Sequence, residues 1–155
     1  MPDRTSFQLP IPGLGRRVVE ADFTGGDVTS DGGAALLRLA DGRADLLRRV
    51  ARTIGDPRQR SKVQHSLLSM LRQRVYGLAL GYEDLNDHET LRGDPGYQTV
   101  VGRDVELASS PTLCRLENRA DRATALAMHR VLVESFMDSF DEPPRGARAG
   151  LRRHR

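Results

Sequence analysis

Cysteine is nearly absent from the 155-residue sequence, and long apolar runs are missing. Because Cys114 is the single cysteine, an internal disulfide and a zinc site built from cysteines are excluded, and we expect Cys114 to be a small buried residue. A membrane-spanning helix needs roughly 18 consecutive apolar residues, and no run approaches that length. The first residues, which include Asp3 and Arg4, also lack the apolar core of a signal peptide. We therefore expect a cytoplasmic protein.

The short motifs of several common enzyme classes are also missing. The histidines are His65, His88, His129 and His154. No two of them stand four residues apart and no HExxH motif occurs, so we expect packing or surface positions rather than metal ligation. The glycine pairs at 25–26 and 32–33 flank a helix start, but neither a Walker lysine nor a complete GxGxxG follows, so turns explain them better than a phosphate cradle. Ser30 lacks the GxSxG context of a hydrolase nucleophile.

Lysine is scarce, and the positive charge is unevenly distributed. The net charge is +3 and the pI is about 9.6. Five arginines lie within residues 145–155, a segment without acids; without these five the chain holds 19 basic against 21 acidic residues. The basic balance therefore belongs to the C-terminal tail and is not by itself evidence that the body binds nucleic acid. Lys62 is the only lysine, and this preference for arginine indicates a GC-rich coding sequence.

The N-terminal third begins with segments that do not favour long helices. Residues 1–16 contain three prolines and two glycines, which predict an extended arm whose order depends on a partner surface. Residues 17–24 alternate partly between apolar and polar side chains and end at Gly25-Gly26, which predicts a short strand. Residues 27–29 are a second candidate for extended structure.

Helical spacing of apolar residues governs most of the remaining chain. Ser or Asp followed by proline marks two helix starts, at Asp94-Pro95 and Ser110-Pro111. The predicted helices run from Asp31 to an interruption at Gly42, then over 46–54, 61–80 and 83–92, briefly after Asp94-Pro95, and over 112–118 and 121–140. The sequence thus predicts a mostly α fold, with one helical domain over residues 17–142 that carries a short N-terminal β element, followed by a disordered basic tail over 143–155.

An acidic cluster occupies the predicted helix at 83–92. Its members are Glu83, Asp84, Asp87 and Glu89. Three- and four-residue spacing brings some of these carboxylates to one helical face, as a metal or acid–base site would require. Acids in a first helical turn also interact favourably with the helix dipole, and like charges at this spacing usually form a solvated face. We favour the second interpretation and predict no metal ligands here.

The segment 107–122 is the best candidate for contact with nucleic acid. A helix that begins at Ser-Ser-Pro is expected to present free backbone N–H groups and hydroxyls to phosphate, and then longer polar side chains to base edges. The candidate residues are Ser109, Ser110, Thr112, Arg115, Asn118 and Arg119. Leu113 and Leu116 would anchor the inner face. A capped amphipathic helix needs no ligand, however, and the acidic helix before it would oppose a DNA backbone.

Three strings in the chain together resemble the N-terminal region of bacterial insertion-sequence transposases of the DDE class. The strings are SFQLPIPGLGRRVVEADFTGGDVTSDGGAALLRLAD, LLSMLRQRVYGLALGYEDLNDHETLRGDP and LASSPTLCRLENR. In that family a tract like GYEDLNDH precedes an SSPTLxRLEN tract. The resemblance covers about residues 5–144.

The resemblance implies a parent enzyme that binds the terminal inverted repeats of a mobile element. Its RNase H-like core would use three carboxylates and Mg²⁺ for hydrolysis and strand transfer. The first of these aspartates is expected shortly after the long helix, in a strand like VLDFDATD. Here Pro143-Pro144 and RGARAGLRRHR stand in that place, without an acid. We therefore expect an N-terminal fragment that lacks the catalytic sheet, with no catalytic residue, no metal ligand and no cofactor of its own.

The composition of the tail suggests how that strand was lost. RGARAGLRRHR can be encoded so that the neighbouring reading frame spells EELVLDFDAT, which is the expected catalytic strand. The tail is therefore predicted to be the product of a frameshift. The codons were chosen freely, so the match shows compatibility alone.

Two functions from different classes follow from the sequence. The first is an N-terminal transposase fragment involved in DNA transposition, which keeps DNA-end recognition or contacts with full-length transposase subunits but not catalysis. The second is a helical protein-interaction module that does not bind nucleic acid. Retention on an inverted-repeat probe separates the two.

Overall fold

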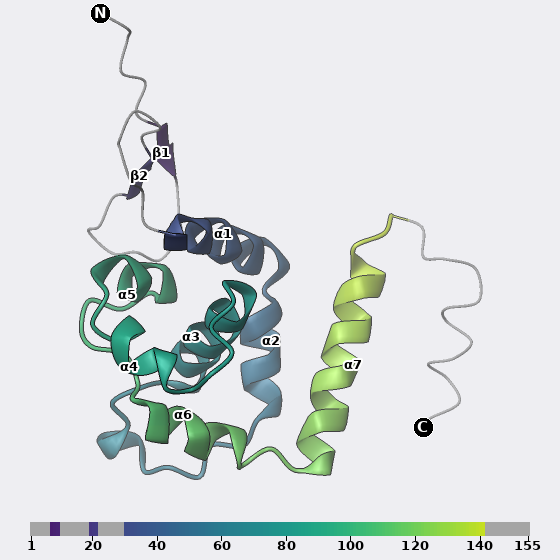
Figure 1. The fold of residues 1–155 in the computed structure, drawn as a ribbon. Coiled ribbons are helices and arrows are strands. Elements are labelled where there is room, and N and C mark those ends of the chain that lie inside the picture. Colours follow the sequence, from purple (N-terminus) through teal and green to yellow (C-terminus); the bar gives the residue numbers. More distant parts are fainter. Residues whose placement is uncertain (1–6, 10–18, 22–29, 142–155) are drawn as a thin grey trace, which may run out of the picture.

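Two short strands precede a group of helices in the computed structural model, which describes residues 7–9, 19–21 and 30–141 (Figure 1). Strand β1 (Phe7–Leu9) pairs antiparallel with β2 (Val19–Ala21), with Gln8 opposite Glu20. β2 falls within the segment 17–24 for which a strand is predicted. The rest of the predicted arm at 1–16, the candidate at 27–29 and the predicted basic tail at 143–155 lie outside the described residues. The described part is mostly α, as predicted.

The chain turns a corner between its first two α-helices at Asp45 (Figure 1). After the 3₁₀ turn η1 (Ser30–Gly33), α1 (Ala34–Ala44) and α2 (Leu46–Thr53) follow each other directly. The predicted interruption at Gly42 is wrong, because one glycine costs a helix only about 1 kcal/mol and α1 continues through it. The chain turns where Asp45 adopts a left-handed conformation with φ 50°.

A buried carboxylate holds this turn in place. The side chain of Asp41 accepts hydrogen bonds from the Leu47 N–H at 2.9 Å, from Arg72 Nε at 3.0 Å and from the Tyr76 hydroxyl at 3.0 Å. It thereby caps the start of α2 and ties both helices to α3. Burial, together with the Asp41 carboxylate, raises the pKa of Tyr76 to about 12, so the phenol keeps the proton that it donates.

Helix α3 (Leu67–Ala79) begins later than the predicted start at residue 61. A short 3₁₀ turn, η2 (Arg60–Lys62), and an extended connection come first. The Ser66 hydroxyl accepts a hydrogen bond from the Ser69 N–H at 3.1 Å and so marks the true N-terminus. Val63 matches the helical spacing of α3 but lies outside the helix, which is why periodicity alone extended the prediction too far.

Helix α4 (Asp87–Leu91) is shorter than the predicted helix at 83–92. The Asp84 carboxylate accepts a hydrogen bond from the Asn86 N–H at 2.9 Å, a local turn that competes with helix formation. In addition, the guanidinium of Arg74 donates to the carbonyl oxygens of Tyr82 and Glu83. These contacts hold residues 82–86 in turns before the helix can start.

Of the caps predicted for the three remaining helices, Asp94 is confirmed for α5 (Pro95–Val101), whereas the N-cap of α6 (Ser110–Glu117) is Ser109, one residue before the predicted Ser110. Helix α7 (Arg122–Asp138) begins at Asp121. The carboxylates of Asp94 and Asp121 each accept a hydrogen bond from a first-turn N–H, at 2.6 and 2.7 Å. None of the helices in the described part of the chain has the length and the apolar run that a membrane span needs.

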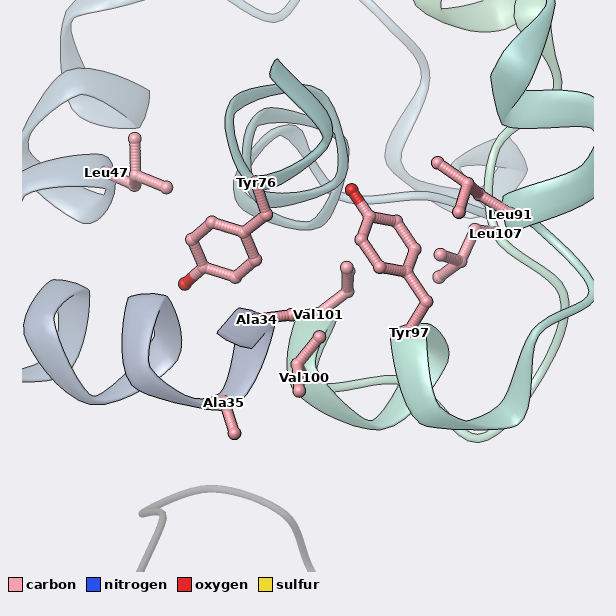
Figure 2. Packing of buried hydrophobic residues seen from close by; sticks show 9 residues of the cluster. All are labelled: Ala34, Ala35, Leu47, Tyr76, Leu91, Tyr97, Val100, Val101 and Leu107. Atoms are coloured by element: carbon pink, nitrogen blue, oxygen red, sulfur yellow. The ribbon is translucent and has the colours of Figure 1, made fainter. Parts of the chain in front are cut away.

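The core divides into two clusters that share α2 and α3. In the first, Tyr76 from α3 and Tyr97 from α5 pack with residues of α1, and Figure 2 shows Tyr97 beside Leu91 and Leu107. The second lies under α6 and α7 and joins four helices through Val50, Met70, Leu71, Leu113, Leu116 and Val131, together with Ala108. This second cluster fixes the position of α6.

Candidate nucleic-acid interface

The connection into α6 is fastened to α3 by one buried amide. Gln73 has no exposed surface; its Nε2 donates to the Ala108 carbonyl at 2.8 Å and its Oε1 accepts from the Ala108 N–H at 3.0 Å. The Leu107 N–H also donates to the Arg92 carbonyl at 3.1 Å. Both backbone polar groups of the buried Ala108 are thereby satisfied, as buried backbone requires. The start of α6 is therefore held rigidly on the core.

The inner face of α6 is the predicted one. Leu113 is 0% exposed and Leu116 is 7% exposed, so both anchor the helix in the second cluster. Cys114 is half-buried, which is less than the burial expected from its apolar character. The outer face of the helix consequently consists of its polar residues.

Three of the predicted interface residues contact one another along α6. The Ser109 and Thr112 hydroxyls lie 3.1 Å apart, and Arg115 Nη2 donates to Thr112 Oγ1 at 3.2 Å. Arg115 is exposed, whereas the two hydroxyl-bearing residues are half-buried. Asn118, also exposed, lies at the C-terminal end of the helix, where its Nδ2 is 3.4 Å from Cys114 Sγ.

The backbone at the N-terminus of α6 differs from the sequence-based expectation. The Ser110 N–H donates to Glu89 Oε1 of α4 at 2.7 Å, the Thr112 N–H donates to the Ser109 carbonyl, and Pro111 has no N–H. The expected free N–H groups of the first turn are therefore not present. The Ser110 N–H, followed by Arg92, lowers the pKa of the Glu89 carboxyl and keeps it charged. A carboxylate stands where phosphate was expected.

Arg119, the last predicted residue, shares an acid with a second arginine. Its Nη1 lies 3.7 Å from Asp56 Oδ1, and Arg58 contacts both oxygens of the same carboxylate at 2.7 Å. The hydrogen bond from Arg58 lowers the pKa of Asp56. Because two guanidinium groups share one carboxylate, this end of α6 retains positive charge.

A basic cluster near the same loop was missed by sequence reasoning. Arg58 Nη1 donates to the His65 carbonyl at 2.9 Å. Burial lowers the pKa of His65, and the positive charges of Arg103, Arg92 and Arg58 lower it further. Arg92 also pairs with Glu89 at 3.3 Å and with Glu106 at 2.9 Å. These arginines are scattered along the sequence, so no spacing pattern could have revealed the cluster.

Two carboxylates of the predicted acidic cluster accept backbone hydrogen bonds. Asp84 accepts from the Asn86 N–H and Glu89 accepts from the Ser110 N–H, whereas Glu83 is held through its backbone carbonyl, which accepts from Arg74. Within the described ranges, no group of three or more histidine, cysteine or acidic side chains is arranged to hold a metal ion.

The histidines occupy different environments. His88 is fully buried, with no hydrogen-bond partner on either ring nitrogen within the described structure, and burial lowers its pKa. His65 is half-buried and His129 is exposed. His154 lies outside the described residues.

Comparison with known proteins identifies the family. The family model described as transposase DDE domain group 1 matches residues 11–146, which is most of the chain. Neither the curated proteins nor the solved structures yield a match. The match spans β2 and all the helices described above, whereas β1 precedes it. The chain belongs to the transposase DDE domain group 1 family, which places it among the proteins of DNA transposition.

Proposed function

We propose that the chain associates with DNA through the outer face of α6 and takes part in transposition by binding rather than by catalysis. The contacts are assigned to Ser109, Ser110, Thr112, Arg115, Asn118 and Arg119, and the DNA partner is the terminal inverted repeat of a mobile element. The observation that carries the proposal is the rigid mounting of α6. Because Gln73 and the buried leucines fix its inner side, its outward polar residues are presented in one orientation.

The geometry favours the C-terminal half of this helix as the main contact. Glu89 occupies the first free amide of α6, so a phosphate at that end would face a carboxylate. Arg115 is exposed, and Arg119 together with Arg58 leaves excess positive charge beside Asp56. Side chains, rather than the helix N-terminus, therefore carry the interaction.

An inverted-repeat duplex tests the proposal. Replacing Arg115 and Arg119 with alanine should abolish specific retention and flatten the dependence of affinity on salt, since each lost phosphate contact releases about one counterion fewer. Arg43→Ala combined with Arg52→Ala is the matched control, because it also removes two positive charges, from exposed positions on α1 and α2. Equal weak binding to any DNA, lost when residues 145–155 are deleted, would contradict the proposal.

A helical protein-interaction module without DNA binding is the second candidate function. The exposed apolar side chains of α7 favour it, because an apolar surface suits contact with protein, including other transposase subunits. Concentration-dependent association of the chain with no retention on the inverted-repeat probe would support this candidate over the first.

The frameshift remains a proposal about the tail. We infer that residues 145–155 are translated out of frame, supported by their five arginines and their lack of acids. Reading the coding DNA tests this directly. If the neighbouring frame does not encode a strand like LDFDAT, the proposal is wrong.

A further inference from the structure

A second concentration of positive charge lies in the connection between α2 and α3. Residues 57–82 contain five bases and no acid, although the chain without its tail is slightly acidic. Two of these bases, Arg72 and Arg74, form ion pairs with acids of other helices. The other three belong to residues 55–65, which we call the basic loop. They are Arg58, Arg60 and Lys62.

Arg58 holds the basic loop in shape. Its backbone N–H donates to the Asp56 carboxylate at 3.2 Å, and its guanidinium contacts both oxygens of that carboxylate at 2.7 Å. Its Nη1 also donates to the His65 carbonyl at 2.9 Å, which joins the two ends of the loop. Pro57 restricts the backbone φ in between. The loop is therefore preorganised, so a ligand need not order it on binding.

Arg60 and Lys62, at the two ends of the turn η2, have no acid against them. Both are exposed, and among the described residues neither forms an ion pair. Arg58, by contrast, is balanced by Asp56. Substitution of Arg60 and Lys62 breaks no side-chain contact of the described fold, so we expect the Tm to be unchanged. These two charges are available to an anion.

The basic loop adjoins the C-terminal end of α6. Arg119 Nη1 lies 3.7 Å from Asp56 Oδ1, and in Figure 1 the loop, in blue, runs past α6 at the bottom of the view. The three bases of the loop and Arg119 stand against Asp56 alone, so four positive charges and one negative charge leave a net +3. The loop and the end of α6 thus form one positively charged surface.

We propose that the basic loop binds the phosphates of duplex DNA, with Arg60 and Lys62 as the contacts. Binding by the loop rests on the proposed association of α6 with DNA and adds the residues that hold the sugar–phosphate backbone beside it. The continuity with α6, in a family of DNA transposition, favours DNA over an acidic protein as the partner. Phosphate contacts position a protein but carry no sequence information. The loop therefore supplies affinity and orientation, and α6 supplies the choice of sequence.

Duplex binding by the full chain at several salt concentrations tests the basic loop. Arg60→Gln combined with Lys62→Gln should lower affinity by at least about tenfold at about 0.1 M salt. The slope of log affinity against log salt should flatten by about 1.8, because each phosphate contact contributes about 0.9. The loss should be equal on the inverted repeat and on an unrelated duplex, since every duplex has the same backbone.

Arg43→Gln combined with Arg130→Gln is the matched control. These arginines are exposed, lie on α1 and in the middle of α7, and form no ion pair among the described residues. The control removes the same charge from the protein as the loop variant does. It should leave the salt slope unchanged, because neither arginine adjoins the loop or α6.

Lys62 is the only lysine of the chain, so a reagent that acetylates lysine reports on one side chain of the basic loop. Mass spectrometry of the peptide that contains Lys62 should show acetylation slowed in proportion to the fraction of protein bound to duplex. Polyglutamate of the same total charge should protect Lys62 less than the duplex does. Equal protection by polyglutamate would assign the loop to an acidic protein and overturn the proposal.

Variants of the two surfaces separate the basic loop from α6. If Arg115→Ala weakens binding while the loop variant binds as the control does and Lys62 reacts equally fast with and without duplex, the loop is not a contact and the proposed role of α6 stands. If the loop variant weakens binding and Arg115→Ala does not, the loop stands and the assignment to α6 is wrong. If the wild-type chain binds no duplex, both are overturned.

Discussion

Gly77 in the middle of α3 provides a sharp test of the first core cluster. A Cβ added there would lie 2.8 Å from His88 Cε1 and 3.2 Å from the Tyr97 hydroxyl oxygen. Both side chains are essentially fully buried, so neither can retreat. Gly77→Ala gains helix propensity worth about 1 kcal/mol, but overpacking a core of this kind costs about 1–3 kcal/mol.

The variant Gly42→Ala separates the gain in helix propensity from the cost of overpacking. Gly42 lies within α1 with open space around its Cβ position, so alanine there should stabilise the protein by about 0.5–1 kcal/mol. The unfolding free energy of Gly77→Ala should therefore be about 1–3 kcal/mol lower than that of Gly42→Ala. Each kcal/mol corresponds to a difference of about 2–4 °C in Tm. Urea and thermal unfolding measure it.

A double variant completes the experiment. In His88→Ala with Gly77→Ala, the space left by the imidazole accepts the new methyl group, so Gly77→Ala should cost less there than in the wild-type background. If Gly77→Ala instead raises the unfolding midpoint as much as Gly42→Ala does, the close packing of His88 against α3 is refuted.

Three further predictions follow from the same contacts. Gln73→Leu should lower the unfolding free energy by about 2–4 kcal/mol in urea titrations, because the Ala108 N–H and carbonyl both lose their buried partner. The unfolding free energy should fall as the pH drops below about 6.5, because burial lowers the pKa of His88 and the unfolded chain then binds a proton more readily than the folded one. His88→Gln should reduce the dependence of the unfolding free energy on pH, and the part that remains should come from His65. Glu89→Gln should increase retention on the inverted-repeat duplex, because it removes the negative charge at the start of α6; unchanged or weaker retention would contradict a phosphate near Ser110.

Local sequence signals predicted the helices that begin at a clear cap. Asp94-Pro95 supplies the cap and first residue of α5, and Ser110-Pro111 forms the first two residues of α6, so the information lies where the helix begins. The starts of α3 and α4 were misplaced for a different reason. Val63 continued an apolar period without being helical, and the turn at Asp84 depends partly on Arg74, which comes from another helix.

The candidate interface was predictable only in outline. The buried leucines and the polar outer face of α6 follow from helical spacing. The contacts of Gln73 with Ala108 and of Glu89 with Ser110 join residues 35 and 21 positions apart, and no periodicity encodes such pairs. For this reason the sequence predicted free N–H groups at the start of α6, whereas in the fold Glu89 and the Ser109 carbonyl accept their hydrogen bonds.

The buried carboxylate of Asp41 has a consequence for a helix that it does not bond. By bonding the first turn of α2 and two side chains of α3, it sets the angle at which α2 leaves α1. Helix α7 packs against α2, so a substitution at Asp41 that changes the angle of α2 should also shift α7. Asp41 thus helps to set the position of α7 through α2, although α7 itself is held by the Arg49 ion pairs and the second core cluster.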